Sequence, residues 1–153
     1  MKGATTFPDV SWFRALGERM TTERERFQRL GYAETRFVIR ILGEGNGSAE
    51  RQIGLAFDGY RLADVEEVRD AEAYDPDFIL CATASVWRRM LDEIAREGRP
   101  ALRHTLNSLV LVGDDMWLES TDQLREDRFY RFNQTLQEFF NLSAASSADR
   151  PRG

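Results

Sequence analysis

The hydrophobic period of the sequence changes abruptly at Arg36, and this change is the strongest constraint on the fold. In residues 36–42 and 52–58, every second position carries a large apolar side chain. Alternation with a period of two places successive side chains on opposite faces of a strand. One face carries Phe37, Ile39, Ile41, Ile53, Leu55 and Phe57. The glycine-rich segment 43–48 lies between the two runs, so we expect an antiparallel hairpin.

Three further segments extend the predicted sheet. An Asp-Gly pair at 58–59 is a turn signal, because Gly accepts a positive φ and Asp tolerates it, so residues 60–68 should pair back as a third strand. Residues 77–83 form an apolar strand candidate. Residues 106–112 are predicted as either one more strand or the end of a short helix, followed by a turn at Gly113 and Asp114.

Other parts of the chain have the three- and four-residue spacing of amphipathic helices. These segments are residues 10–20, 85–98 and about 124–142. A further helical piece is expected to start at Thr22, in a capping box with Glu25, and to end at Gly31. Ser85 is the expected N-cap of the helix that precedes Gly98.

The order of these elements predicts an α+β fold, with helices on one face of a largely antiparallel sheet. At 153 residues, the chain fits one domain, which we place at residues 1–142. Residues 143–153 lack a bulky apolar side chain and are predicted to be a disordered tail.

Charge and composition exclude several classes of partner. There are 26 acidic and 21 basic residues, a net charge of −5, and the basic residues are scattered, which argues against nucleic acid. No apolar run is long enough to span a membrane, and the start lacks the pattern of a secretory signal, so we expect a cytoplasmic protein. A single cysteine, Cys81, cannot form an internal disulfide.

No set of residues forms a recognisable catalytic centre or metal site. His104 is the only histidine, which excludes sites built from several His ligands and favours a surface or packing role. Cys81 lies in an apolar strand, where a buried inert thiol is favoured over a reactive one. Asp114 and Asp115 fit a turn better than a cation site. We therefore expect no enzyme activity, no metal and no cofactor.

Two polar features have both a structural and a ligand-binding interpretation. Gly43, Gly45 and Gly47 resemble a phosphate-binding loop, but the helix that such a loop requires is missing, so a hairpin connection is favoured. Arg40 should point away from the apolar face of its strand. It is either a solvent-facing side chain or a contact for a ligand head group.

Aromatic and soft apolar side chains are unusually abundant, with ten Phe, three Trp and four Met. Several of them fall on segments that would cover the sheet: Trp87, Met90, Met116, Trp117, Phe129, Phe132 and the nearby Leu136. Core packing accounts for most of this bulk. The remainder is consistent with a lined cavity, since small-molecule sites are mostly apolar.

The order of elements and several phrases resemble the sterol carrier protein two family of lipid-binding domains, over about residues 7–142. The resemblance is carried by Phe7, Pro8, Asp9 and Trp12, by the hairpin 37–57, by the strand-and-helix unit 78–94, and by the phrase Leu109, Val110, Leu111, Val112, Gly113 and Asp114. In the family, an apolar strand ending in Gly and Asp leads into the segment that completes the pocket. Leu106, Asn107 and Ser108 depart from the small residue and Gly or Lys usual there, which implies a differently shaped pocket.

The resemblance implies a five-stranded, largely antiparallel sheet with helices on one side, no cofactor and no reaction. It also implies that a fatty acyl chain, acyl-CoA or sterol-like molecule is held between the sheet and the helices. The expected lining residues are Trp87, Met90, Met116, Trp117, Phe132, Leu136 and Phe139, with Phe37 and Phe57 as additions to the floor. The alternative is an accessory or dimerising subunit, such as a homodimer, whose core is filled by protein.

Overall fold

The computed structural model describes residues 6–44 and 50–144. Its helices are α1 (Val10–Thr22), α2 (Arg24–Gln28), α3 (Ala71–Tyr74), α4 (Ala84–Glu97), the short 3₁₀ helix η1 (Leu102–His104), α5 (Leu106–Val112) and α6 (Gln123–Asn141). Its strands are β1 (Ala33–Leu42), β2 (Arg51–Gly59), β3 (Arg61–Glu67), β4 (Phe78–Thr83) and β5 (Met116–Glu119).

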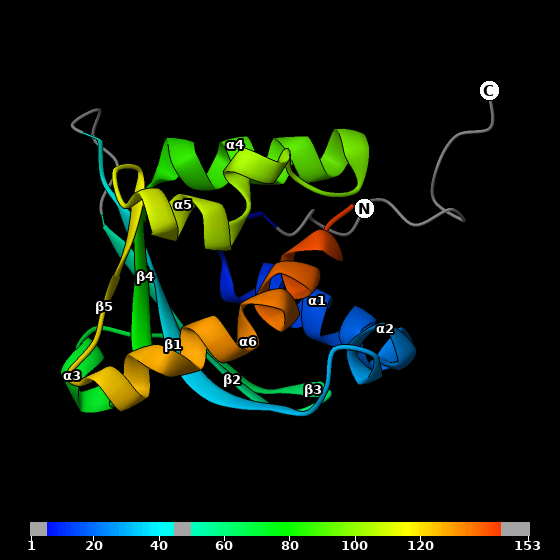
Figure 1. Cartoon of the computed structure of the whole chain (residues 1–153), viewed down its shortest axis with the longest axis horizontal. Coiled ribbons are helices and arrows are strands. Elements are labelled where there is room, and N and C mark those ends of the chain that lie inside the picture. The colour runs from blue at the N-terminus through cyan, green and yellow to red at the C-terminus, as the bar shows by residue number, and fades with distance from the viewer. Residues whose placement is uncertain (1–5, 45–49, 145–153) are drawn as a thin grey trace.

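The five strands form one sheet in the order β3-β2-β1-β4-β5 (Figure 1). β1 and β4 run parallel, and the other three neighbouring pairs are antiparallel. The predicted hairpin is present, with Phe37 opposite Leu55. Gly59 has a φ of +77°, as its turn position requires. The α+β class and the five-stranded, largely antiparallel sheet are therefore confirmed.

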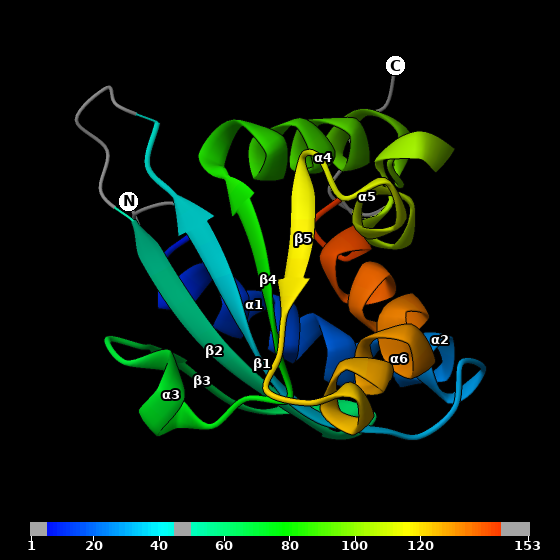
Figure 2. The same ribbon diagram turned by 60° about the vertical axis from the view of Figure 1, so that its left-hand side comes forward.

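The two faces of the sheet are covered differently. We call the face that carries Phe37 the inner face and the face that carries Arg40 the open face. Helices α1, α4, α5 and α6 gather on the inner side, whereas α3 lies at the other side near one end of the sheet (Figure 2). On the open face, Ala71 and Tyr74 of α3 pack with Val38 in a small separate cluster.

The apolar segment 106–112 is a helix. The prediction of a strand here, which the family resemblance also implied, is therefore wrong. The Thr105 side chain accepts a hydrogen bond from the backbone N–H of Ser108, and Gly113 ends the helix with a φ of +82°. Leu106, Leu109 and Val110 are buried, a spacing of three and four residues that fits a helix with one covered side. The fifth strand follows the turn, at residues 116–119.

Neither predicted N-cap is formed as expected. Thr22 lies inside α1 and its hydroxyl donates to the carbonyl of Glu18, so there is no capping box with Glu25. Thr83 is the N-cap of α4, and Ser85 lies within its first turn. The Glu44 carboxylate instead accepts hydrogen bonds from the Ser85 N–H at 2.9 Å and from its hydroxyl at 2.7 Å.

The folded part extends slightly beyond the predicted domain boundary at residue 142. Ala144 is buried, and its carbonyl accepts a hydrogen bond from Arg19 at 2.9 Å. The remainder of the predicted tail, residues 145–153, lies outside the described residues, as do residues 45–49 of the predicted turn.

Candidate functional site

Eight of the nine predicted lining residues meet on the inner side of the sheet. Seven of them are at most 2% exposed and form what we call the inner layer: Phe37, Phe57, Trp87, Met90, Met116, Leu136 and Phe139. Phe132 is partly buried and packs against the same core. Residues from two halves of the sequence, on β1, β2, α4, β5 and α6, are thus brought into one apolar layer.

Strand register and aromatic contacts hold the sheet side of the inner layer. Phe37 is opposite Phe78 on the parallel strand, and the two rings stack with centroids 5.3 Å apart. The Phe57 ring lies 5.4 Å from Phe37 and 5.3 Å from Phe139 of α6. Offset and edge-to-face ring contacts of this kind stabilise a core beyond the area they bury.

The helix side of the inner layer has two polar anchors. The Trp87 indole N–H donates to the carbonyl of Arg40 at 3.3 Å, which satisfies the ring's polar atom at the sheet. Gln137 of α6 accepts the backbone N–H of Leu106 at 2.8 Å, and its amide nitrogen lies 3.8 Å from the Met90 sulfur. Gln137 therefore ties α6 to the start of α5 and to α4.

The described side chains of the inner layer pack against one another and against their neighbours. Six of the seven have an exposed fraction of 0% and Phe57 has 2%. A guest between the sheet and the helices must therefore move some of these side chains. Met90 and Met116 suit such a rearrangement, because an unbranched thioether adapts its shape at low cost.

Trp117 is the predicted lining residue that lies elsewhere. Cys81 and Ile79 of β4 are on the open face, because they pair with Arg40 and Val38 of β1. Trp117 pairs with Cys81 and Glu119 pairs with Ile79, so both β5 residues also belong to the open face. Met116 is adjacent in the strand and faces inward, because successive strand side chains point in opposite directions. Met116 and Trp117 therefore do not line the same space.

Arg40 also lies on the open face, as expected, but it is less exposed than a solvent-facing side chain. Its side chain is 20% exposed, and it donates to Gln52 at 3.0 Å and to Glu119 at 2.9 Å. Burial acts to lower the pKa of Arg40, but the bond to Glu119 and nearby negative groups outweigh it, and the pKa is raised.

The Glu119 carboxylate, on the edge strand β5, belongs to the same network. One oxygen accepts from Arg40, and the other accepts the Trp117 indole N–H at 3.2 Å. Burial acts to raise the pKa of Glu119, yet the hydrogen bonds from Trp117 and Arg40 lower it overall. At neutral pH, Arg40 and Glu119 are therefore a charged pair held in a fixed geometry.

Cys81 lies beneath this pair and is fully buried. Burial raises the pKa of its thiol to about 12, because the thiolate would lose its hydration. The thiol is therefore protonated at physiological pH, which agrees with the predicted inert role.

The other candidate chemical residues, His104, Asp114 and Asp115, do not assemble into one centre. His104 Nδ1 lies 2.6 Å from a Glu93 oxygen, and the other Glu93 oxygen accepts the Ala101 N–H. Asp115 lies 3.5 Å from Arg89, and Asp114 is exposed. Within residues 6–44 and 50–144, no group of three His, Cys, Asp or Glu residues could hold a metal ion.

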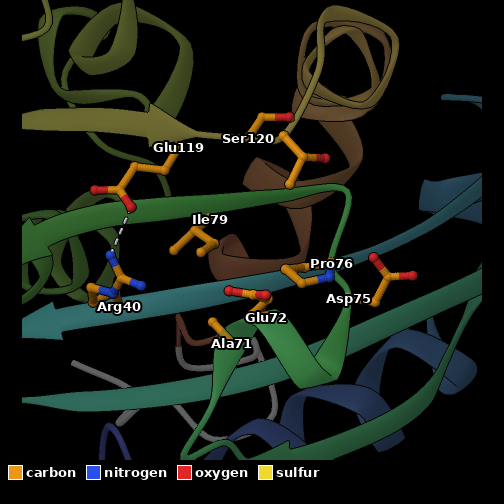
Figure 3. Close-up of a pocket in the computed structure, with 9 residues that line it drawn as sticks. Arg40, Ala71, Glu72, Asp75, Pro76, Ile79, Glu119 and Ser120 are labelled. Carbon is orange, nitrogen blue, oxygen red and sulfur yellow. Dashed lines mark hydrogen bonds and ion pairs between the residues drawn. The ribbon is translucent and has the colours of Figure 1, made fainter.

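A pocket of about 530 Å³ opens on the open face and was not predicted from the sequence (Figure 3). One wall comes from α3 and the residues after it, the other comes from the end of β5, and strands β1 and β4 provide the floor. The lining residues are Ala71, Glu72, Asp75 and Pro76, then Glu119, Ser120 and Thr121, with Arg40 and Ile79. Because α3 spans only four residues in a polar stretch, its periodicity could not be recognised.

The described part of the chain offers no helix with both the length and the apolar character needed to cross a lipid bilayer. No protein-family model matches the sequence, and no curated protein matches it either.

Two solved structures match the fold over nearly the whole chain. A crystal structure of sterol carrier protein 2 aligns with a TM-score of 0.68 and 14% identity, covering 93% of this chain and 100% of that one. A solution structure of a conserved hypothetical protein from Thermus thermophilus, described as a candidate sterol carrier protein, aligns with a TM-score of 0.59 and 13% identity. That alignment covers 98% of this chain and 97% of the other. The chain therefore has the fold of sterol carrier protein 2.

Proposed function

We propose that this protein is a binding or carrier module for an apolar small molecule, such as a fatty acyl chain, an acyl-CoA or a sterol-like lipid. The single observation that carries the proposal is the inner layer, in which soft and aromatic side chains from five elements meet between sheet and helices. The sterol carrier protein 2 fold supports the same class of ligand. We propose no catalytic step and no cofactor. We also propose that the protein is cytoplasmic.

The energetics allow useful affinity. Burial of an alkyl chain contributes about 0.8 kcal/mol per methylene, so roughly sixteen methylenes contribute about 13 kcal/mol. With an association cost of about 4 kcal/mol, this leaves at least the roughly 8 kcal/mol that micromolar binding needs. The guest also has to displace side chains that pack together in its absence, so the helices must shift as it enters.

Native mass spectrometry of the protein, purified without added lipid, is the first test. We expect a copurified apolar molecule, and a fluorescent fatty acid should bind with a saturable signal that unlabelled long-chain acids or sterols reverse. A folded monomer that binds none of these ligand classes would contradict the proposal.

Release kinetics provide a second test of where the ligand lies. The double variant Phe132→Ala with Leu136→Ala should release the fluorescent acid faster, because it loosens α6 over the inner layer. Leu124→Ala is the matched control, since Leu124 lies on the same helix but is 81% exposed. Equal release rates for the double variant and the control would place the ligand elsewhere.

An accessory or dimerising subunit is the second candidate function. Three apolar side chains near α5 favour it, because Leu102, Leu111 and Val112 are 87%, 67% and 71% exposed. Large exposed apolar side chains are enriched at interfaces between proteins. Analytical ultracentrifugation over a wide concentration range separates the two: a monomer at all concentrations removes the homodimer from consideration.

A further inference from the structure

The open-face pocket is separate from the inner layer and has the size of a ligand site. Its volume of about 530 Å³ falls within the range of roughly 300–1,000 Å³ that is typical for small-molecule pockets. The sheet itself lies between the two spaces, because Ile79 belongs to the open face and Phe78 to the inner face. A guest here would therefore not compete with a ligand of the inner layer.

Three of the residues that line the pocket are apolar. Ile79 lies on the floor, with Ala71 and Pro76 beside it on the α3 side (Figure 3). Side chains of this kind bind hydrocarbon by removing it from water. The pocket thus offers a surface for the apolar body of a small molecule.

Two of the three carboxylates that line the pocket are paired with an arginine. Glu119 pairs with Arg40 at 2.9 Å, and Asp75 pairs with Arg125 at 2.6 Å. Glu72 is the remaining lining carboxylate, and its side chain forms no ion pair with any residue in the described ranges. In Figure 3 its carboxylate lies below Ile79 and beside Pro76. The lining therefore carries one uncompensated negative charge beside an apolar surface.

We propose that the open-face pocket binds a protonated amine with a small apolar body, the ammonium group at Glu72 and the hydrocarbon on Ile79 and Pro76. An anionic guest is disfavoured because its charge would meet Glu72, and the Arg40 guanidinium is already engaged by Glu119 and Gln52. A neutral guest of the same shape gains the apolar contact but not the charge interaction.

Two indole N–H groups report separately on the open-face pocket and on the inner layer. The Trp117 N–H is bonded to Glu119 at the pocket wall, and the Trp87 N–H is bonded to a carbonyl in the core. Titration of the full chain with hexylammonium at pH 7, followed by NMR, should shift the Trp117 N–H resonance with saturation and leave the Trp87 resonance unchanged. Hexanol should bind more weakly, and hexanoate should bind weakest. Added salt should weaken the binding of the amine.

The charge is tested by Glu72→Gln, which keeps the shape of the side chain. It should weaken hexylammonium binding about three- to fivefold, the range expected for an exposed charge pair. Glu66→Gln, on the same face at β3 and outside the pocket, is the matched control and should leave the affinity unchanged. Tighter binding of hexanoate, an unchanged affinity in Glu72→Gln, or the absence of saturation would each overturn the proposal.

Discussion

The two faces of the sheet are built from the same strands, but different interactions stabilise them. The inner face carries Phe37 and Phe57 against four helices, and its side chains are stabilised by burial of apolar surface. The open face carries Arg40 and Glu119, and the short α3 covers part of it. One set of strands therefore holds an adaptable apolar layer on one side and a fixed polar network on the other.

The largest effect should come from shortening a side chain of the inner layer. Leu136→Ala removes a side chain with 0% exposure and leaves a cavity, so the free energy of unfolding should fall by about 2–5 kcal/mol. Leu124→Ala, on the exposed side of the same helix, should stay within about 0.5 kcal/mol. Chemical denaturation measures both. Similar losses in the two variants would show that α6 does not depend on the inner layer.

A smaller effect is expected where α3 meets the open face. A Cβ at Gly54 would lie 2.5 Å from Cζ of Tyr74, so Gly54→Ala should lower the free energy of unfolding by about 1–3 kcal/mol. Adding Tyr74→Ala should make the Gly54→Ala change nearly neutral, because the clash is gone. A double-mutant cycle measures this coupling, and an absence of coupling would contradict the packing of α3 on the sheet.

The polar network should contribute less than either packing contact. Glu119→Gln removes the charge that pairs with Arg40, and about half of the Glu119 side chain is exposed, so we expect a loss of roughly 0.5–1 kcal/mol at neutral pH. Because folding lowers the pKa of Glu119, this contribution is present above the unfolded pKa and is lost as the pH falls through the lower folded value. Denaturation at several pH values, for the wild type and the variant, checks the sign: their difference should shrink in acid.

The smallest effect at neutral pH is expected at Cys81. The buried thiol should resist a thiol reagent in the native chain at pH 8 and react after unfolding. Burial raises its pKa from 9.0 to about 12, so its contribution to stability is present below pH 9 and is lost as the pH rises through about 12. Relative to the wild type, Cys81→Ala should therefore show a shallower loss of stability above pH 9. Rapid native labelling would contradict the burial of the thiol.

The fold was largely predictable because its strongest signals are local. Alternation over residues 36–42 and 52–58 identified the central hairpin, and the apolar spacing of residues 124–142 identified α6 within one residue at each end. Segment 106–112 was ambiguous because seven apolar and small polar residues fit either period. Its helix is decided by a Thr105 cap and by which side is covered.

The candidate site was predicted where it depends on burial and missed where it depends on position. Large apolar side chains are driven from water wherever they stand, so eight of the predicted residues reached the inner side of the sheet. Trp117 was misplaced because β5 has only four residues, too few for its alternation to stand out. Once that strand is known, Met116 and Trp117 must face opposite sides.

The periods of the main helices and strands, the Asp-Gly turn, and the set of side chains that must be buried can all be read from the sequence, because they depend on residues close together in the chain. The parallel pairing of β1 with β4, the hydrogen bond from Ser85 of α4 to Glu44 and the open-face pocket all depend on tertiary packing. Each of these joins residues about forty or more positions apart, such as Arg40 and Glu119. Contacts at that separation are set by how the elements pack, which no local pattern of residues encodes.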